Sequence, residues 1–458
     1  MKLSFLILLT LVLAKPLRSG DGETQAVRPN VLFIAIDDLN DWTGYLGGHP
    51  QAQTPNLDRL AASGVAFMQA YCAAPVCIPS RAAVLTGIPP HISGITNNIG
   101  LFRQKQPDLV TLPQRMRAGG YRVMKAGKLF HHPDPVSWDE QLPNSRSSYK
   151  LPKPPKLGQD IRGLEWGALD VAESQLIDHK ISDWVCAQLG KSWDQPFFLA
   201  CGLIKPHLPW SVPQRFFDMF PLEEIQLPLA PVDDLNDMPK VGAQRARSVF
   251  HGQIIKQNKW KAAIQAYLAT VAYCDERVGA ILNALAEGPN AKNTLVILWS
   301  DHGMALGEKK HWQKWGLWED TTRVPLIFAG PGIPVGVQNP HAVGILDLYR
   351  TTLELCGMQA SEQLGGHSLV PLIQDPKLSR PAPVLTTLNK EHSVRSDRWR
   401  LIRYIDGSYE LYDHSVDPHE WTNLAELPEH GKLIRELAGW MPEQKRAPKR
   451  SPGPKKKR

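Results

Sequence analysis

The 458 residues of this chain, 43% of them hydrophobic, are enough to bury a large core, and one large domain with a smaller one is the arrangement expected for this length. The net charge of +7 indicates no nucleic-acid partner, because residues 445–458 carry eight Lys and Arg and no acid, which leaves −1 for the remaining residues. Six cysteines, at positions 72, 77, 186, 201, 274 and 356, are too few and too irregularly spaced for a disulfide-based scaffold.

Residues 1–20 have the pattern of a secretory signal peptide. Lys2 supplies a positive charge, and the apolar run over residues 3–14 is long enough for a signal and too short to cross a bilayer. Cleavage near Ala14 and cleavage near Ser19 both fit the sequence. We therefore predict a secreted or periplasmic protein with no integral membrane segment after signal removal.

From residue 28 onward, apolar strands alternate with helices. Residues 31–36 form an almost wholly apolar run, which predicts a buried strand. Thr54 and Pro55 then mark the start of a helix, as N-cap and first helical residue. Residues 196–204 predict another buried strand, and residues 260–285 a long amphipathic helix. This alternation is typical of an α/β domain.

Two predicted strands end in residues that can bind a metal. Asp37 and Asp38 follow the first strand, and Asp301 and His302 follow a β-branched apolar run over residues 294–299. Open α/β sheets bind their ligands at this end of the strands. Three carboxylates and an imidazole suit a hard divalent cation such as Ca²⁺. Each pair alone is also compatible with a turn or a helix cap.

The large domain is predicted to end near residue 375, and the pattern beyond it is one of short strands. Residues 324–328 predict a last core strand of the large domain, and residues 347–356 a helix that ends at Gly357. Short strands follow, including a hairpin around Asp406-Gly407, and then a closing helix over residues 429–440. We expect a large domain over residues 28–375, a smaller α+β subdomain over residues 376–442 and a disordered basic tail over residues 443–458. The tail is either a solvated segment or a loose binder of polyanions.

The segment Cys77-Ile78-Pro79-Ser80-Arg81, with Leu85-Thr86-Gly87 beyond it, carries the most information in the chain. Pro79 favours the first turn of a helix, so Cys77 should lie at a helix N-terminus, where free N–H groups attract anions. Taken by itself, Cys77 could be a buried structural cysteine or form a disulfide with Cys72. The full segment resembles the modification signature of the type I sulfatases, in which a separate maturation enzyme oxidises the cysteine to formylglycine.

Further matches to this family lie along the chain. They are the segments Gly120-Tyr121, Gly127-Lys128 with His131, Lys205-Pro206-His207, and Gly307-Glu308 to Lys314. The neighbouring His132 leaves the assignment of His131 open by one position. The resemblance covers roughly residues 28 to 425. Within the family, the chain resembles the iduronate-2-sulfatase branch most, because Asp301-His302 stands where many relatives have Asp-Asn.

The resemblance implies a fold, a cofactor set and a role for each residue. The fold would be α/β, with an alkaline-phosphatase-like large domain, a central mixed β-sheet flanked by helices, and a smaller C-terminal α+β subdomain. One Ca²⁺ would be held by the four residues at the strand ends and by the modified Cys77. Arg81 would hold the hydrated aldehyde, which is the nucleophile. The remaining site residues would be Lys128 and Lys314 on the sulfate oxygens, His207 as the leaving-group acid, and His131 as the base that re-forms the aldehyde.

The expected activity is hydrolysis of sulfate esters on a sulfated carbohydrate. A sulfate monoester leaves as an alkoxide, so the reaction requires fixed positive charge and an acid for the leaving group. One alternative is a phosphate or phosphonate ester hydrolase with the same fold, although Cys77 within its full signature disfavours it. The other is a non-catalytic relative that binds polyanions through the same cationic pocket.

Overall fold

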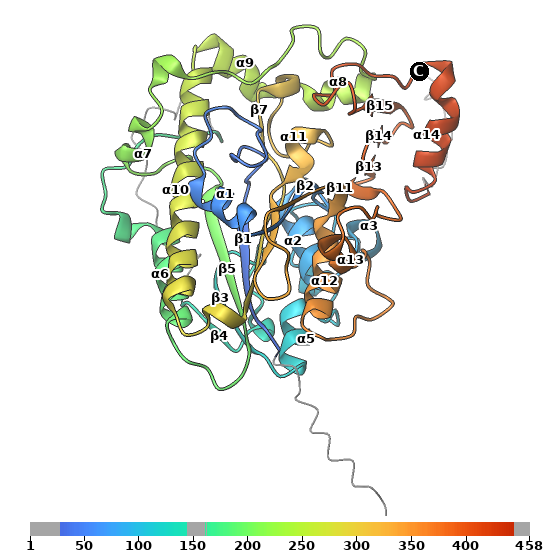
Figure 1. Ribbon diagram of the computed structural model, residues 1–458. Coiled ribbons are helices and arrows are strands. Elements are labelled where there is room, and N and C mark those ends of the chain that lie inside the picture. Colours follow the sequence, from blue (N-terminus) through green and yellow to red (C-terminus); the bar gives the residue numbers. More distant parts are fainter. Residues whose placement is uncertain (1–27, 144–160, 162, 444–458) are drawn as a thin grey trace, which may run out of the picture.

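The computed structural model describes residues 28–143, 161 and 163–443 (Figure 1). The predicted signal peptide and residues 444–458 of the predicted tail lie outside these ranges. Within them, no helix combines the length and the apolar character needed to cross a membrane.

A nine-stranded mixed sheet forms the centre of the molecule (Figure 1). Its order is β11-β2-β10-β6-β1-β5-β3-β4, with β9 paired to β2. β1 is parallel to both β5 and β6, whereas β10 runs antiparallel to β6 and β2. The strands are β1 (Asn30–Asp37), β2 (Gly64–Tyr71), β3 (Arg122–Gly127), β4 (Glu140–Gln141), β5 (Phe197–Pro206), β6 (Thr294–Ser300), β9 (Arg323–Val324), β10 (Leu326–Ala329) and β11 (Val337–Gly344).

Side chains of β1 alternate between two apolar cores, one on each face of the sheet. Leu32, Ile34 and Ile36 enter one core and Val31 and Phe33 the other, and all are fully buried. This explains why the run is apolar without interruption: a central strand covered on both faces has no side chain facing water. The predicted buried strand is thus confirmed.

Helices cover both faces of the sheet (Figure 1). α1, α6, α7 and α10 contribute to the core that contains Leu32, and α2, α5 and α12 to the core that contains Val31. The helices are α1 (Pro55–Ala62), α2 (Cys77–Thr86), α3 (Pro90–Ser93), α4 (Phe102–Lys105), α5 (Leu112–Ala118), α6 (Ile177–Leu189), α7 (Gln214–Asp218), α8 (Lys240–Ala246), α9 (Val249–Lys256), α10 (Trp260–Glu287), α11 (Glu319–Thr322), α12 (Leu348–Leu355), α13 (Val370–Gln374) and α14 (Gly431–Ala438). The α/β architecture with a central mixed sheet between helices is confirmed.

A separate antiparallel sheet near the C-terminus has the order β12-β13-β14-β15. Its strands are β12 (Val384–Leu388), β13 (Glu391–Arg395), β14 (Trp399–Arg403) and β15 (Tyr409–Asp413), and a further two-stranded ribbon joins β7 (Ala305–Leu306) to β8 (Trp312–Gln313). The hairpin between β14 and β15 turns at Gly407, where φ is +89°. The closing helix α14 is shorter than expected because its first turn, Pro428–His430, is a 3₁₀-helix. The strand expected over residues 324–328 is divided between β9 and β10 at Pro325, which has no N–H to donate.

Candidate active site

The carboxyl ends of β1 and β6 lie side by side and bring two sequence-distant pairs of residues together. Ile36 is in register with Ser300, so Asp37-Asp38 and Asp301-His302 leave the sheet at the same edge. The Asp38 N–H donates to Asp301 Oδ1 at 3.1 Å. All four side chains are almost completely buried. Both pairs therefore enter one buried polar cluster, as their positions after the strands indicated.

Asp38 adopts a backbone conformation that is rare for a non-glycine residue, with φ at +65°. The Tyr267 hydroxyl holds it there by donating to the Asp38 carbonyl at 2.9 Å, and the next N–H, of Leu39, donates to Ser300 Oγ at 3.1 Å. Strained backbone of this kind persists where the surroundings fix it, and it directs the Asp38 carboxylate into the cluster.

Cys77 is the first residue of α2, and its sulfur faces the same cluster. Its Sγ lies 3.3 Å from His302 Nε2 and 3.0 Å from Lys314 Nζ. The helix start is fixed by Asn98 Oδ1, which accepts from the Ile78 N–H at 2.8 Å, and by Ser80 Oγ, which donates to the Asp301 carbonyl at 2.5 Å. The predicted position at a helix N-terminus is confirmed, and none of the six cysteines is in a disulfide.

The Cys77 thiol lies in a strongly cationic environment. Burial alone would raise its pKa, but Lys128, Lys314 and His302 lower it further than burial raises it, so the pKa is well below the usual value. Burial also disfavours a charged Asp37, but Lys128, His207, Arg81 and Lys314 hold the pKa of that carboxyl well below its usual range. The site thus stabilises negative charge at both positions.

Arg81 is fully buried and orients the carboxylates. Its Nε donates to Asp301 Oδ2 at 2.7 Å, and its Nη2 donates to Asp37 Oδ1 at 3.1 Å. Nη1 donates to the carbonyls of Lys128 and Leu129 on the loop after β3. One guanidinium therefore ties β1, β6 and the β3 loop together from α2.

Two lysines and a histidine complete the cluster. Lys128 Nζ pairs with Asp37 Oδ2, and Lys314 Nζ lies 3.0 Å from Asp38 Oδ1. His207 Nε2 is 3.8 Å from Asp38 Oδ2, and its Nδ1 lies 2.6 Å from the Leu208 carbonyl. Because that carbonyl can only accept, Nδ1 carries a proton and Nε2 faces the cluster. The His207 side chain is 31% exposed, so it lies between the buried cluster and solvent.

His131 lies on the same loop as Lys128, three residues further along. Its ring is half-buried and packs edge to face against His132, with ring centroids 4.9 Å apart. Both imidazoles therefore lie on the loop that carries Lys128.

The donor atoms at the strand ends fit a divalent cation. Asp38, Cys77 and His302 each place one donor within 4.8 Å of the others, and so do Asp37, Cys77 and Asp301. His302 Nδ1 donates to the Gly303 carbonyl at 2.9 Å, which leaves Nε2 directed at the other donors. Burial raises the pKa of Asp301 to about 6, although Arg81 opposes this, so a buried carboxylate here gains from a nearby cation.

A family model described as Sulfatase matches residues 29–358. The chain belongs to the sulfatase family. A second model, described as the C-terminal part of N-sulphoglucosamine sulphohydrolase, matches residues 307–447. A sulfatase of Formosa agariphila is 39% identical over 438 residues, which make up 91% of this chain and 86% of that protein.

Two further similar proteins are sulfatases whose names specify a substrate. Iduronate 2-sulfatase of Mus musculus is 35% identical over 343 residues, which cover 68% of this chain and 61% of that protein. A solved structure of a 2-O GAG sulfatase has the same fold, with a TM-score of 0.71, 23% identity and 90% of each chain covered. The sequence-based assignment to the sulfatase family is confirmed, while the likeness to iduronate 2-sulfatase spans only part of each chain.

Several residues that shape this sulfatase site carried no signal in the sequence. Tyr267 lies on α10, more than 200 positions from the Asp38 carbonyl that it binds. Asp178, at the start of α6, accepts from the N–H groups of Ile204 and Lys205 at 2.9 and 2.7 Å and so fixes the backbone just before His207. Only Asn98, close to the Cys77 segment in sequence, could have been noticed as a cap for that helix.

Proposed function

We propose that this protein is an iduronate-2-sulfatase-like sulfuric ester hydrolase that removes sulfate from a sulfated carbohydrate, with a formylglycine made from Cys77 and a bound Ca²⁺. The position of Cys77 Sγ carries the proposal, since it lies 3.3 Å from His302 Nε2 and 3.0 Å from Lys314 Nζ at a helix N-terminus. A nucleophile placed there would meet an incoming sulfate group among fixed positive charges.

The cofactor set follows from the donors around that position. Asp37, Asp38, Asp301 and His302 would hold the Ca²⁺, with the modified Cys77 as a further ligand. When bound, the ion supplies positive charge beside the nucleophile, and the formylglycine supplies a nucleophilic oxygen. Arg81 would hold the hydrated aldehyde and, through its contacts with Asp37 and Asp301, keep the carboxylates in place.

Two lysines would stabilise the charge that develops on the sulfate oxygens. Lys128 and Lys314 approach the cluster from different loops, and each contacts a different carboxylate, Asp37 and Asp38. A sulfate group entering between them would exchange these ion pairs for contacts with its own oxygens. Positive charge fixed in this way acts on the transition state without reorganisation of solvent.

His207 is suited to protonate the departing alcohol. Its Nε2 faces the cluster because Nδ1 is bonded to the Leu208 carbonyl, and its partly exposed ring marks the side from which a sugar would approach. Lys314 would assist on the same side. His131 would act as the base that removes the proton when sulfate is released.

Two similar proteins support a particular sugar as the carrier of the sulfate. Iduronate 2-sulfatase and a 2-O GAG sulfatase are among the proteins similar to this chain. We infer a 2-O-sulfated uronic acid within a glycan as the leading substrate. The apolar N-terminal segment supports export to the periplasm or beyond, where such glycans are met, and the Cys77 segment supports a formylglycine-generating enzyme as maturation partner.

A substrate panel tests this function. A 2-sulfated uronate disaccharide, a 6-sulfated hexosamine, choline sulfate, an aryl sulfate and an aryl phosphonate ester are compared by kcat/KM, after mass spectrometry of the peptide that contains Cys77. We expect formylglycine at position 77 and the highest kcat/KM on the uronate. Preference for choline or aryl sulfate over every sugar refutes the glycan assignment, and preference for the phosphonate refutes the sulfatase activity.

A further inference from the structure

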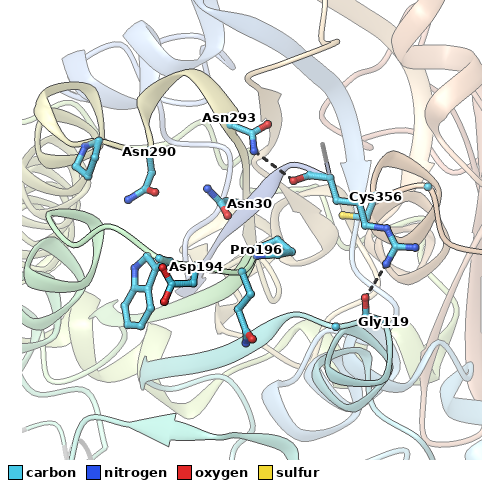
Figure 2. Close-up of a pocket in the computed structure, with 13 residues that line it drawn as sticks. Asn30, Gly119, Asp194, Pro196, Asn290, Asn293 and Cys356 are labelled. Atoms are coloured by element: carbon cyan, nitrogen blue, oxygen red, sulfur yellow. Dashed lines mark hydrogen bonds between the residues drawn. The ribbon is translucent and has the colours of Figure 1, made fainter. Parts of the chain in front are cut away.

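A large cavity (Figure 2) lies at the amino ends of the central strands, whereas the active site lies at the carboxyl ends of β1 and β6. Its volume is about 890 Å³, within the range of about 300–1,000 Å³ that small-molecule sites occupy. The lining residues come from the start of β1 and the residue Arg28 before it, from the segments that precede β3, β5 and β6, and from the two residues that follow α12. Since β1 has eight residues, its amino end is about 23 Å from Asp37.

Asn30 presents a side-chain hydrogen-bond donor at the wall of this cavity. The residue is 7% exposed, and its Oδ1 accepts from the Phe197 N–H at 3.1 Å. Its Nδ2 has no partner anywhere in the described part of the chain, and the side chain lies in the middle of the lining (Figure 2). The residue is largely buried while this donor faces the cavity, so the donor is held in place and is available to a ligand or to ordered solvent there.

Acceptors stand opposite this donor. Asn290 Nδ2 donates to the carbonyls of Leu189 and Lys191 at 3.0 and 2.8 Å, which leaves its Oδ1 for a ligand. Asn293 Nδ2 donates to the Arg28 carbonyl at 3.2 Å and likewise leaves Oδ1 (Figure 2). Arg28 uses one N–H on the Gly119 carbonyl at 2.6 Å and keeps other N–H groups for a ligand.

The charge and the polar groups of the other lining residues indicate which class of ligand fits. Asp194 and Gln195 are exposed, and neither side chain has a hydrogen-bond partner within the described ranges. Arg28 and Asp194 are the charged lining residues, so the cavity is close to neutral and lacks the cationic cluster that a phosphate ester requires. Trp193 adds a half-buried indole, held by the Arg122 guanidinium at 5.0 Å from its centroid. Planar amides that offer both donors and acceptors around an indole match the alternating hydroxyls and apolar faces of a sugar ring.

We propose that this cavity is a second, non-catalytic site for a desulfated uronate-containing saccharide. Asn30, Asn290, Asn293 and Gln195 would bind hydroxyl and amide groups, and Arg28 would pair with the uronate carboxylate. The site would keep the enzyme on its glycan while the distant active site removes sulfate. This inference rests on the proposed function for the choice of sugar, and its test does not depend on turnover.

Binding of a desulfated uronate–N-acetylhexosamine tetrasaccharide, measured by ligand-observed NMR titration, tests the site. Asn30→Asp keeps the acceptor for the Phe197 N–H and removes the free donor. Gln195→Trp fills the cavity without removing a hydrogen bond. Asn236→Asp, at an exposed position outside the lining, is the matched control.

We expect the two cavity variants to bind the tetrasaccharide at least about tenfold more weakly, and the control to bind it like the wild-type protein. Their turnover of a small aryl sulfate should be unchanged, because the active site is distant. Absence of binding to the wild-type protein overturns the proposal. So does binding that both cavity variants leave intact and Lys314→Ala removes, since the tetrasaccharide is then a product in the active site. If the cavity variants weaken binding while no sulfated sugar is hydrolysed, the proposed function fails and this site stands.

Discussion

At the scale of single residues, the decisive feature is how charge is balanced around Cys77. Asp37, Asp38 and Asp301 are buried together, which is unfavourable unless cations accompany them. Arg81 pairs with Asp37 and Asp301. Lys128, Lys314 and His302 add positive charge beside the Cys77 sulfur. The site therefore favours an anionic oxygen or sulfur at position 77.

Cys77→Ala should abolish sulfatase turnover and leave the fold intact. The substitution removes the atom from which the nucleophile is made, while the buried thiol contributes packing of only about 1–2 kcal/mol. Turnover and thermal melting are measured side by side. Cys72→Ala, at another buried cysteine, is the control and should keep its activity. Turnover of Cys77→Ala near that of the wild-type protein would rule out the mechanism.

His392 should make the protein less stable in mild acid. Burial, with help from Arg403 and His91, lowers its pKa to about 4, against about 6.5 in an unfolded chain. Between these pH values the unfolded chain binds more protons, so the unfolding free energy should fall from pH 6.5 to 4, by up to about 1.4 kcal/mol per pH unit. Denaturant titrations at several pH values measure this slope. His392→Gln should flatten the slope and the exposed His419→Gln should not, whereas equal slopes in all three proteins would contradict the assignment.

At the scale of elements, the segment over residues 307–318 is strained and presents Lys314 to the site. Lys309, Lys310, Gln313 and Trp315 all have positive φ, from +48° to +78°. Each such residue costs about 1–2 kcal/mol and persists only where neighbours hold it. Lys309 Nζ, which is buried, donates to Asp234 Oδ1 at 3.0 Å and to the Glu420 carbonyl. These two contacts form a clamp: Lys309 ties the segment to the loop that carries Asp234 and to the C-terminal residue Glu420.

Lys309→Met should misplace Lys314 and reduce turnover unevenly across substrates. If Lys314 and His207 assist the departing alcohol, an alkyl sulfate should lose more activity than an aryl sulfate, whose leaving group needs little protonation. Kinetics on both esters measure the ratio. Lys310→Met, which removes a bond to the Val232 carbonyl at the surface, is the matched control and should leave that ratio unchanged. A loss of equal size on both esters would mean that the clamp serves stability alone.

The sequence predicted the elements whose burial follows from a local pattern of apolar residues. β1 and β6 are apolar on both faces and end in ligand-type residues, so strand and site could both be predicted. β11 and β13 could not, because β11 contains Pro340 and an irregular register, and β13 buries charged side chains such as Glu391 and Arg395. Burial of such groups depends on partners far away in the chain. The contact from Tyr267 to Asp38 likewise joins residues that are far apart in the chain, so no local pattern could reveal it.

At the scale of the whole molecule, a buried ion network joins the C-terminal sheet to the active-site side of the large sheet. Arg400, on β14, is fully buried and pairs with Glu319 Oε2 at 2.5 Å and with Glu420. The Glu319 N–H donates to Glu420 Oε2 at 2.9 Å, and His414 pairs with Glu420 at 2.9 Å. Glu319 opens α11, shortly after the segment that carries Lys314, so the C-terminal sheet supports the loop that brings Lys314 to Cys77.

Calcium should stabilise the whole molecule as well as support turnover. A ligand that binds only the folded state adds about 2.7 kcal/mol to the unfolding free energy at one hundred times its Kd. The melting temperature of chelator-treated protein should therefore rise by several degrees when Ca²⁺ is restored. In Asp301→Asn this rise should be lost, because the variant lacks one anionic donor of the cluster.

The control for this measurement is Asp183→Asn, at a carboxylate of α6 whose side chain is 63% exposed and which belongs to no donor cluster among the described residues. Its melting temperature should respond to Ca²⁺ as that of the wild-type protein does. The shift should be moderate, because Lys128 and Lys314 already neutralise Asp37 and Asp38 when the ion is absent. A melting temperature that is the same with and without Ca²⁺, after incubation long enough for slow release, would show that the four strand-end residues hold no calcium.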